Sequence, residues 1–359
     1  MYLKNLKLIN FKNFEEKEFQ FSSKINCIVG QNGMGKTNTL DAIHYLSLTK
    51  SYLQFSDLLN IKFDEEFFVI EGNFVSNESE DIIRISVKKE QKKVIKKNNK
   101  AYEKITDHIG KYATVVISPY DRDLITEGSE FRRKFLDGML SQLNPEYLHT
   151  LIRYNKIVLQ RNTLLKYFSN NHTFNVENLE IYNKEFIENA AYIHKKRHDF
   201  LALFSPKLLH YYNKISPNKE QVNLEYHSQL NHDSMENLLK NNVEKDRQST
   251  YTNAGIHKDD LRFNINENPI KKFGSQGQQK TFLIALKLAQ MSIFKEISGI
   301  NPILLLDDIF DKLDETRVSQ LIHLVNEEHF GQIFITDTHT KRTEDIVKQI
   351  DENSLIFEL

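Results

Sequence analysis

This sequence contains very little cysteine and carries almost no net charge. Its 359 residues include one cysteine, Cys27, and carry a formal net charge of −1. A single thiol excludes a disulfide or a multi-cysteine metal site within one chain, and we expect Cys27 to be an inert core residue. The balanced charge excludes any argument from bulk charge, so contact with nucleic acid would have to come from a local basic patch.

Long apolar runs, sequence repeats and sustained heptads are also absent. No apolar segment approaches the length that crosses a bilayer, and residues 1–5 (MYLKN) do not begin a secretory signal. We therefore expect a soluble, cytoplasmic protein. The length suits two or three domains with a sizeable core, without a long coiled coil.

The segment around which the chain is organised covers residues 25–48. An apolar run at 25–29 (INCIV) predicts a short buried strand, and apolar residues at helical spacing follow from Leu40. Between them the sequence matches G-x-x-x-x-G-K-[ST], in which backbone N–H groups cradle phosphates, the lysine reaches the β- and γ-phosphates and the hydroxyl binds Mg²⁺. A glycine turn with a chance Lys-Thr pair is the alternative, and the flanking strand and helix speak against it. The predicted phosphate-binding residues are Gly30, Gln31, Asn32, Gly33, Met34, Gly35, Lys36, Thr37 and Asn38.

A second constellation lies at residues 303–308 (ILLLDD), where four aliphatic residues precede two carboxylates. The aliphatics predict a strand buried on both faces of a parallel sheet, and ligand sites lie at the carboxyl ends of such strands. Asp307 is then a candidate Mg²⁺ ligand, and Asp308 a candidate to orient or deprotonate the attacking water. A helix-capping aspartate pair is the alternative, which the phosphate loop makes less attractive.

A third segment, residues 273–280 (FGSQGQQK), precedes a strongly apolar helical pattern. Ser275, Gly277 and Gln278 lie at the predicted start of that helix, where hydroxyl, amides and dipole favour an anion. A plain helix cap would be the better interpretation if this segment stood alone. It stands one helix length before the aspartate strand.

The remaining pattern divides the chain into three parts. Residues 1–118 are rich in predicted strands, among them 67–74, 82–87 and 114–117. Residues 119–247 are mainly helical, with helices predicted at 129–143, 146–168 and 177–204. A strand at 222–226 is expected to return the chain to the first domain, and 248–359 completes that domain.

The phosphate loop, the Ser-Gln-Gly-Gln-Gln segment, the aspartate strand and the following Leu313-Asp314 resemble the ABC-type ATPase heads of the SMC group. Within that group the chain is similar to the RecF family of bacterial recombination proteins. Supporting segments are LINFKNF (8–14), GSEFRRKFLD (128–137), YNKIVLQRN (154–162) and GIHKDDL (255–261). The resemblance implies an α/β P-loop ATPase head with an inserted, mainly helical lobe and no long coiled coil.

The resemblance also implies that two heads dimerise around two ATP molecules. The phosphate loop would then act in cis, Ser275 and Gly277 would contact the γ-phosphate in trans, and Asp314 would lie in the loop that crosses the interface. Many relatives carry glutamate where this chain has Asp308, so we expect slow hydrolysis that suits a switch. His339 occupies the region of a γ-phosphate-sensing histidine, although a surface histidine is an equal alternative.

RecF proteins bind gapped or junction-bearing DNA and, with RecO and RecR, help load RecA, and the resemblance implies the same partners here. Candidate phosphate contacts crowd one hairpin, unless this charge run is only a solvated face. They are Lys88, Lys89, Lys92, Lys93, Lys96 and Lys97, with the run 195–197 (KKR) as a weaker candidate. An ATP-held interaction scaffold without direct DNA contact is the competing hypothesis, and a transporter ATPase fits the amino-terminal strands poorly.

Overall fold

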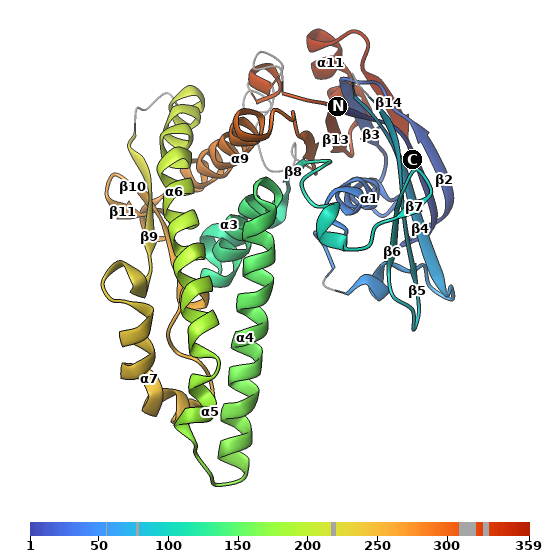
Figure 1. Cartoon of the computed structure of the whole chain (residues 1–359). Coiled ribbons are helices and arrows are strands. Elements are labelled where there is room, and N and C mark those ends of the chain that lie inside the picture. The colour runs from blue at the N-terminus through green and yellow to red at the C-terminus, as the bar shows by residue number, and fades with distance from the viewer. Residues whose placement is uncertain (55, 77–78, 217–219, 309–320, 326–329) are drawn as a thin grey trace. The chain divides into compact units, whose positions relative to one another are not determined.

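The computed structural model describes residues 1–54, 56–76, 79–216, 220–308, 321–325 and 330–359. The chain divides into two compact units (Figure 1), of which the first comprises Met1–Asp121, Lys214–Pro217 and Lys280–Leu359, and the second Arg122–Asn213 and Asn218–Gln279. The final return to the first unit falls at Lys280, later than the predicted residue 248.

A six-stranded antiparallel sheet forms one layer of the first unit. Its strand order is β2-β1-β4-β5-β6-β7. The sheet has one buried face because its strands alternate: in β5, Ile83, Ile85 and Val87 are buried while Arg84 is exposed. The strands are β1 (Tyr2–Phe11), β2 (Phe14–Gln20), β4 (Phe67–Val75), β5 (Glu80–Lys88), β6 (Val94–Lys97) and β7 (Lys100–Ala101). The predicted strands in this region are confirmed.

A five-stranded parallel sheet forms the second layer, in the order β14-β3-β13-β12-β8. Every residue of β3, β12 and β13 is buried, as expected for strands covered on both faces. Helix α1 (Lys36–Leu48) packs between the two sheets, because Leu40, Ile43 and Leu46 share one apolar core with both. The strands are β3 (Ile25–Val29), β8 (Thr114–Ile117), β12 (Ile303–Leu306), β13 (Ile333–Asp337) and β14 (Leu355–Glu358). Helix α11 (Thr340–Ile350) follows β13, and α9 (Gln276–Ser298) carries the chain from the second unit into the first.

The second unit is mainly helical and holds a small sheet in the order β11-β10-β9. Its helices are α2 (Asp123–Thr126), α3 (Ser129–Leu143), α4 (Pro145–Asn170), α5 (Val176–Glu180), α6 (Asn183–Ile215), α7 (Met235–Ser249) and α8 (Ile270–Phe273). Its strands are β9 (Val222–His227), β10 (Asp260–Ile265) and β11 (Asn268–Pro269), and short 3-10 turns join the elements. No helix among the residues that the structure describes is long and apolar enough to span a membrane.

Two sequence predictions in this unit were wrong. The single helix predicted at 177–204 is α5 and α6, and α6 continues through Pro206 to Ile215. Proline removes one helical hydrogen bond, but the buried Phe204 and Leu208 on either side hold the helix in the core. The strand predicted to return to the first domain is β9, which pairs with β10 inside the second unit.

Candidate nucleotide-binding site

The phosphate loop lies between β3 and α1 as predicted, and its conformation requires glycine at position 35. Gly35 has φ 113°, and a Cβ atom there would come within 2.5 Å of the Phe14 ring. Lys36 is 4% exposed, and its Nζ donates to the carbonyl oxygens of Gly30 at 2.8 Å and Gln31 at 3.1 Å. The lysine charge therefore already lies inside the loop, where phosphate oxygens would replace these carbonyl partners.

Asn13, from the turn between β1 and β2, braces the loop. Its side-chain amide donates to the carbonyl oxygen of Met34 at 3.1 Å, and its side-chain oxygen accepts from Asn38 at 2.7 Å. Gln31 and Asn32 remain exposed. The loop is thus held in place by Asn13, while Gln31 and Asn32 stay open to solvent.

Asp307 lies at the carboxyl end of β12 and is brought to the phosphate loop by the parallel register of β3, β13 and β12. Its Oδ1 accepts hydrogen bonds from Thr37 Oγ1 at 2.9 Å and Thr336 Oγ1 at 3.0 Å. Burial raises the pKa of the Asp307 carboxyl above its usual value, against the effect of these hydroxyl donors.

Thr37 and Asp307 suit Mg²⁺, which prefers oxygen ligands and is typically held by one or two protein groups together with substrate phosphates. In the described part of the chain no cluster of three or more His, Cys, Asp or Glu side chains could hold a metal independently. Thr37 and Asp307 would hold a nucleotide-bound Mg²⁺, whose positive charge would offset that of the phosphates.

Asp308 follows directly and has an unusual backbone. Its φ of 45° lies in the left-handed region, which aspartate tolerates better than most residues. Its N–H donates to Thr336 Oγ1 at 2.9 Å, so one threonine contacts both aspartates. Asp314 lies outside the described residues.

The residues that fix the other side of Asp307 were not predicted from the sequence. Tyr52 donates its hydroxyl to Asp307 Oδ2 at 3.1 Å, and Asp41 Oδ1 accepts from the Tyr52 backbone N–H at 2.9 Å. Asp41 is fully buried and pairs with Lys12 Nζ at 2.6 Å. Only the spacing of Asp41, one helical turn after Thr37, was a signal that could have found this group.

The predicted anion-binding residues Ser275, Gly277 and Gln278, which we call the signature, lie at the start of α9. Ser275 and Gln278 form a reciprocal cap: Ser275 Oγ accepts from the Gln278 N–H at 3.2 Å, and Gln278 Oε1 accepts from the Ser275 N–H at 2.6 Å. Gln278 Nε2 also donates to Glu220 at 2.6 Å. Ser275 is exposed and Gly277 half-buried, so the end of this helix is accessible.

The candidate DNA lysines divide into two groups. Lys89, Lys93 and Lys97 pair with Glu66, Asp57 and Asp81 at 2.9, 2.8 and 2.8 Å. The Lys93 side chain is only 11% exposed and also donates to the Thr49 carbonyl oxygen, which leaves it little capacity for phosphate. Lys88, Lys92 and Lys96 are exposed.

The weaker candidate for DNA contact, the run 195–197, was wrong for Arg197. This arginine is 1% exposed, pairs with Asp137 and Asp259, and cannot reach a ligand at the surface. His339 is exposed at the start of α11, and its carbonyl oxygen accepts from Thr343. Its role stays a prediction.

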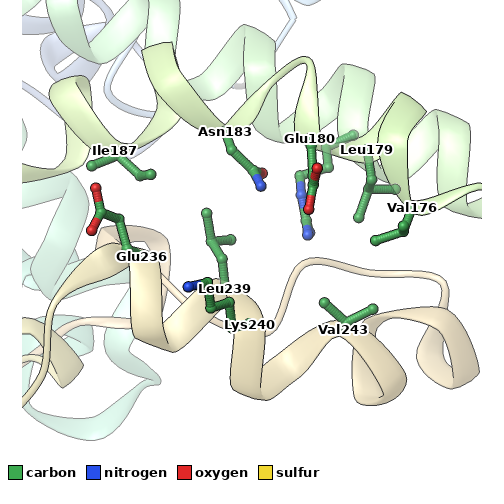
Figure 2. Close-up of a pocket in the computed structure, with 10 residues that line it drawn as sticks. Val176, Leu179, Glu180, Asn183, Ile187, Glu236, Leu239, Lys240 and Val243 are labelled. Carbon is green, nitrogen blue, oxygen red and sulfur yellow. The ribbon is translucent and has the colours of Figure 1, made fainter.

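A cavity of about 210 Å³ lies inside the second unit between α4, α5, α6 and α7 (Figure 2). Glu236 and Leu239 approach it from α7, across from Asn183 and Ile187 of α6. None of the predicted site residues lines it. The candidate site is therefore the phosphate loop with Asp307, and the exposed start of α9.

A strand, phosphate loop and helix, with an aspartate strand two places away in the same parallel sheet, define a P-loop ATPase head. The family model "RecF/RecN/SMC N terminal domain" matches residues 2–357. "DNA replication and repair protein RecF" of Flavobacterium johnsoniae is 54% identical over 359 residues, which is 100% of both chains. The protein of that name from Phocaeicola vulgatus is 45% identical over 99% of this chain and 96% of its own. The chain belongs to the RecF family.

Solved structures agree. A recombination mediator protein RecF with ATP, described as part of the RecFOR pathway, matches with a TM-score of 0.87 and 31% identity over 94% of this chain and 92% of that chain. An SMC head bound to the winged-helix domain of ScpA matches with a TM-score of 0.57 and 15% identity, over 96% of this chain and 92% of its own. The latter likeness concerns the fold alone. The expected fold, an ABC-type ATPase head of the SMC group, is thereby confirmed.

Proposed function

We propose that this chain is an ATP-dependent DNA-binding protein of recombinational repair. The observation that carries the proposal is the buried Lys36 inside the phosphate loop together with the bond from Thr37 to Asp307. This group is suited to ATP with Mg²⁺. The names of the full-length relatives supply the biological context, DNA replication and repair.

ATP would join two copies of the chain. The phosphate loop of one copy would bind the β- and γ-phosphates, and Ser275 and Gly277 of the other would approach the γ-phosphate. The exposure of Ser275 at the start of a 23-residue helix supports this role, because a trans contact needs an accessible anion-binding end. Gln278 would complete the composite site together with Asp314, which lies outside the described residues.

Hydrolysis would be slow and serve as a switch. Asp308 is one methylene shorter than glutamate, so its carboxylate reaches less far toward a water at the γ-phosphate. Asp307 and Thr37 would hold Mg²⁺. His339 would sense the γ-phosphate only if the dimer brings it to the nucleotide.

DNA would contact the outer face of the antiparallel sheet near β5 and β6. Across this face Lys7 pairs with Glu18 at 2.6 Å, and Glu71 lies beside Arg84 at 3.8 Å. Lys96 lies directly opposite Arg84 in the strand register, so positive charge is in excess where β5 and β6 pair. The surface that we propose for phosphate contact consists of Lys88, Lys92 and Lys96. Lys89 and Lys97 are less available for phosphate, because each already pairs with a carboxylate.

The partners that we propose are gapped or junction-bearing duplex DNA, RecO, RecR and RecA, and the compartment is the cytoplasm. The ion pairs of Lys89, Lys93 and Lys97 favour a second candidate function. In this alternative ATP holds a dimeric scaffold and the partner proteins supply all DNA contact.

One experiment separates direct DNA binding from the scaffold alternative. It measures binding of the purified protein to gapped duplex DNA over a range of salt concentrations, with ATP and with ADP. We expect tight binding only with ATP and a steep loss of affinity with salt, because released counterions drive phosphate contact. Absence of binding by the isolated protein, with ATP-dependent dimerisation intact, would favour the scaffold.

A further inference from the structure

Three hydroxyl groups surround Asp307, and they divide its two oxygen atoms between them. Thr37 and Thr336 donate to Oδ1, while Tyr52 alone among the described residues donates to Oδ2, at 3.1 Å. Asp307 is 2% exposed, so its orientation depends on these partners more than on water.

The position of Tyr52 is itself fixed by the helix that carries Thr37. Asp41, four residues after Thr37 on α1, accepts the Tyr52 N–H on Oδ1 at 2.9 Å and the Ser51 hydroxyl on Oδ2 at 2.7 Å. Ser51 Oγ in turn accepts from the N–H groups of Leu53 and Gln54, which closes a tight turn.

The Tyr52 ring is held as firmly as its backbone. It meets the ring of His44 edge-on, with centroids 5.4 Å apart and planes at 89°. His44 lies against Thr114 at 3.2 Å, and burial lowers the pKa of His44 to about 4, so its ring is neutral at physiological pH. The Tyr52 hydroxyl therefore reaches Asp307 from a preorganised segment.

We propose that Tyr52 is a positioning residue for the divalent cation that accompanies the nucleotide. Its hydroxyl fixes Asp307 Oδ2, so that Oδ1 is presented beside the Thr37 hydroxyl, the pair of oxygens suited to Mg²⁺. Hydrogen bonds to the second oxygen of a ligating carboxylate set its orientation and basicity. This inference rests on the proposed nucleotide-binding function and adds a residue to it.

The test measures Mg²⁺-dependent binding of a fluorescent ATP analogue, without any need for hydrolysis. Tyr52→Phe removes the hydroxyl and keeps the ring, and we expect the half-saturating Mg²⁺ concentration to rise by about tenfold. Binding of the analogue without Mg²⁺ stays unchanged, because the phosphate loop is untouched. Tyr45→Phe is the matched control: it removes a buried hydroxyl bonded to Asp57 at 2.6 Å, on α1 but away from Asp307, and leaves the Mg²⁺ requirement unchanged.

Ser51→Ala provides a second variant that keeps the Tyr52 hydroxyl but loosens its turn, and we expect a smaller rise. An unchanged Mg²⁺ requirement in both variants overturns the proposal. A lowered requirement overturns it too, because the hydroxyl would then compete with the cation. Wild-type protein that binds no nucleotide contradicts the proposed function and this inference together, whereas wild-type binding with unaffected variants contradicts the inference alone.

Discussion

Thr37 and Asp307 are 270 positions apart in the sequence, and their side-chain oxygens lie 2.9 Å apart. The parallel register explains the approach, because β13 pairs with β3 on one side and with β12 on the other. The carboxyl ends of these strands meet at one edge of the sheet. The first unit thereby brings together the distant segments of the nucleotide site that we propose.

Replacing Asp308 by glutamate should increase ATP turnover. The longer side chain extends the carboxylate toward the γ-phosphate water, so we expect a rise of several-fold in single-turnover hydrolysis, with nucleotide affinity unchanged. Asp308→Asn, which keeps the size but loses the charge, should hydrolyse at least about tenfold more slowly than wild type. Equal rates in wild type and Asp308→Asn would exclude Asp308 from the chemical step.

The proposed DNA surface makes a prediction about neighbouring lysines. Lys92→Ala and Lys96→Ala should each weaken binding to gapped DNA and reduce the salt dependence by about one counterion for each lysine replaced. Lys93→Ala is the matched comparison on the same hairpin. Because Lys93 pairs with Asp57 and is 11% exposed, its replacement should lower the melting temperature and leave the salt slope unchanged. The reverse pattern would move the DNA surface elsewhere.

The core of the second unit depends on Arg197. Its guanidinium donates to Asp137 at 2.9 Å and to Asp259 at 2.7 Å. Arg197→Met should lower the free energy of unfolding by about 3–5 kcal/mol, because it leaves two carboxylates uncompensated near each other. Lys195→Ala, at an exposed position of the same helix, should stay within about 0.5 kcal/mol of wild type in urea unfolding. A stable Arg197→Met protein that no longer binds DNA would restore the sequence prediction for this patch.

Acid should destabilise the first unit through His108. This side chain is fully buried, bonds to the Leu46 carbonyl oxygen at 2.6 Å, and burial lowers its pKa to about 4. In the unfolded chain the pKa of histidine is near 6.5. Between pH 6.5 and pH 4 the unfolded chain therefore binds a proton that the folded chain does not bind. The free energy of unfolding falls as the pH falls through this range. The linkage amounts to about 2 kcal/mol between pH 7 and pH 5.

His108→Gln should remove that part of the pH dependence, as measured by urea unfolding at the two pH values. His172→Gln, at an exposed loop position, should leave the dependence as it is in wild type. A pH dependence that survives unchanged in His108→Gln would mean that His108 is not the residue responsible.

The sequence predicted the parts of the site that are local in the chain. The phosphate loop and the strand of Asp307 follow from patterns of a few residues, since their chemistry demands those residues at that spacing. Tyr52 was not predictable, because its contact with Asp307 depends on a turn anchored to Asp41 and on the packing of distant strands. Arg197 looked like part of a basic run, and only the packing of α6 determines that it points inward.

The lobe boundaries illustrate the same limit. The strand 222–226 was predicted, but its partner was not, since pairing is set by tertiary structure. The helix predicted at 177–204 was too short at its carboxyl end, because α6 continues through Pro206 to Ile215, where buried residues on either side hold it in the core.

In the function that we propose, ATP joins the phosphate loop of one copy to the signature of another. The most direct test is light scattering of wild type, Lys36→Ala, Ser275→Ala and an equal mixture of the two variants, each with ATP and with ADP. We expect dimers of wild type with ATP alone, and monomers of each variant. Ser275→Ala should still bind nucleotide and Lys36→Ala should not. In the mixture one complete composite site forms, from the loop of the Ser275→Ala copy and the signature of the Lys36→Ala copy, so dimers should return in part. Dimers of Ser275→Ala that match wild type, or an oligomeric state indifferent to ATP, would show that the two copies are not joined in this way.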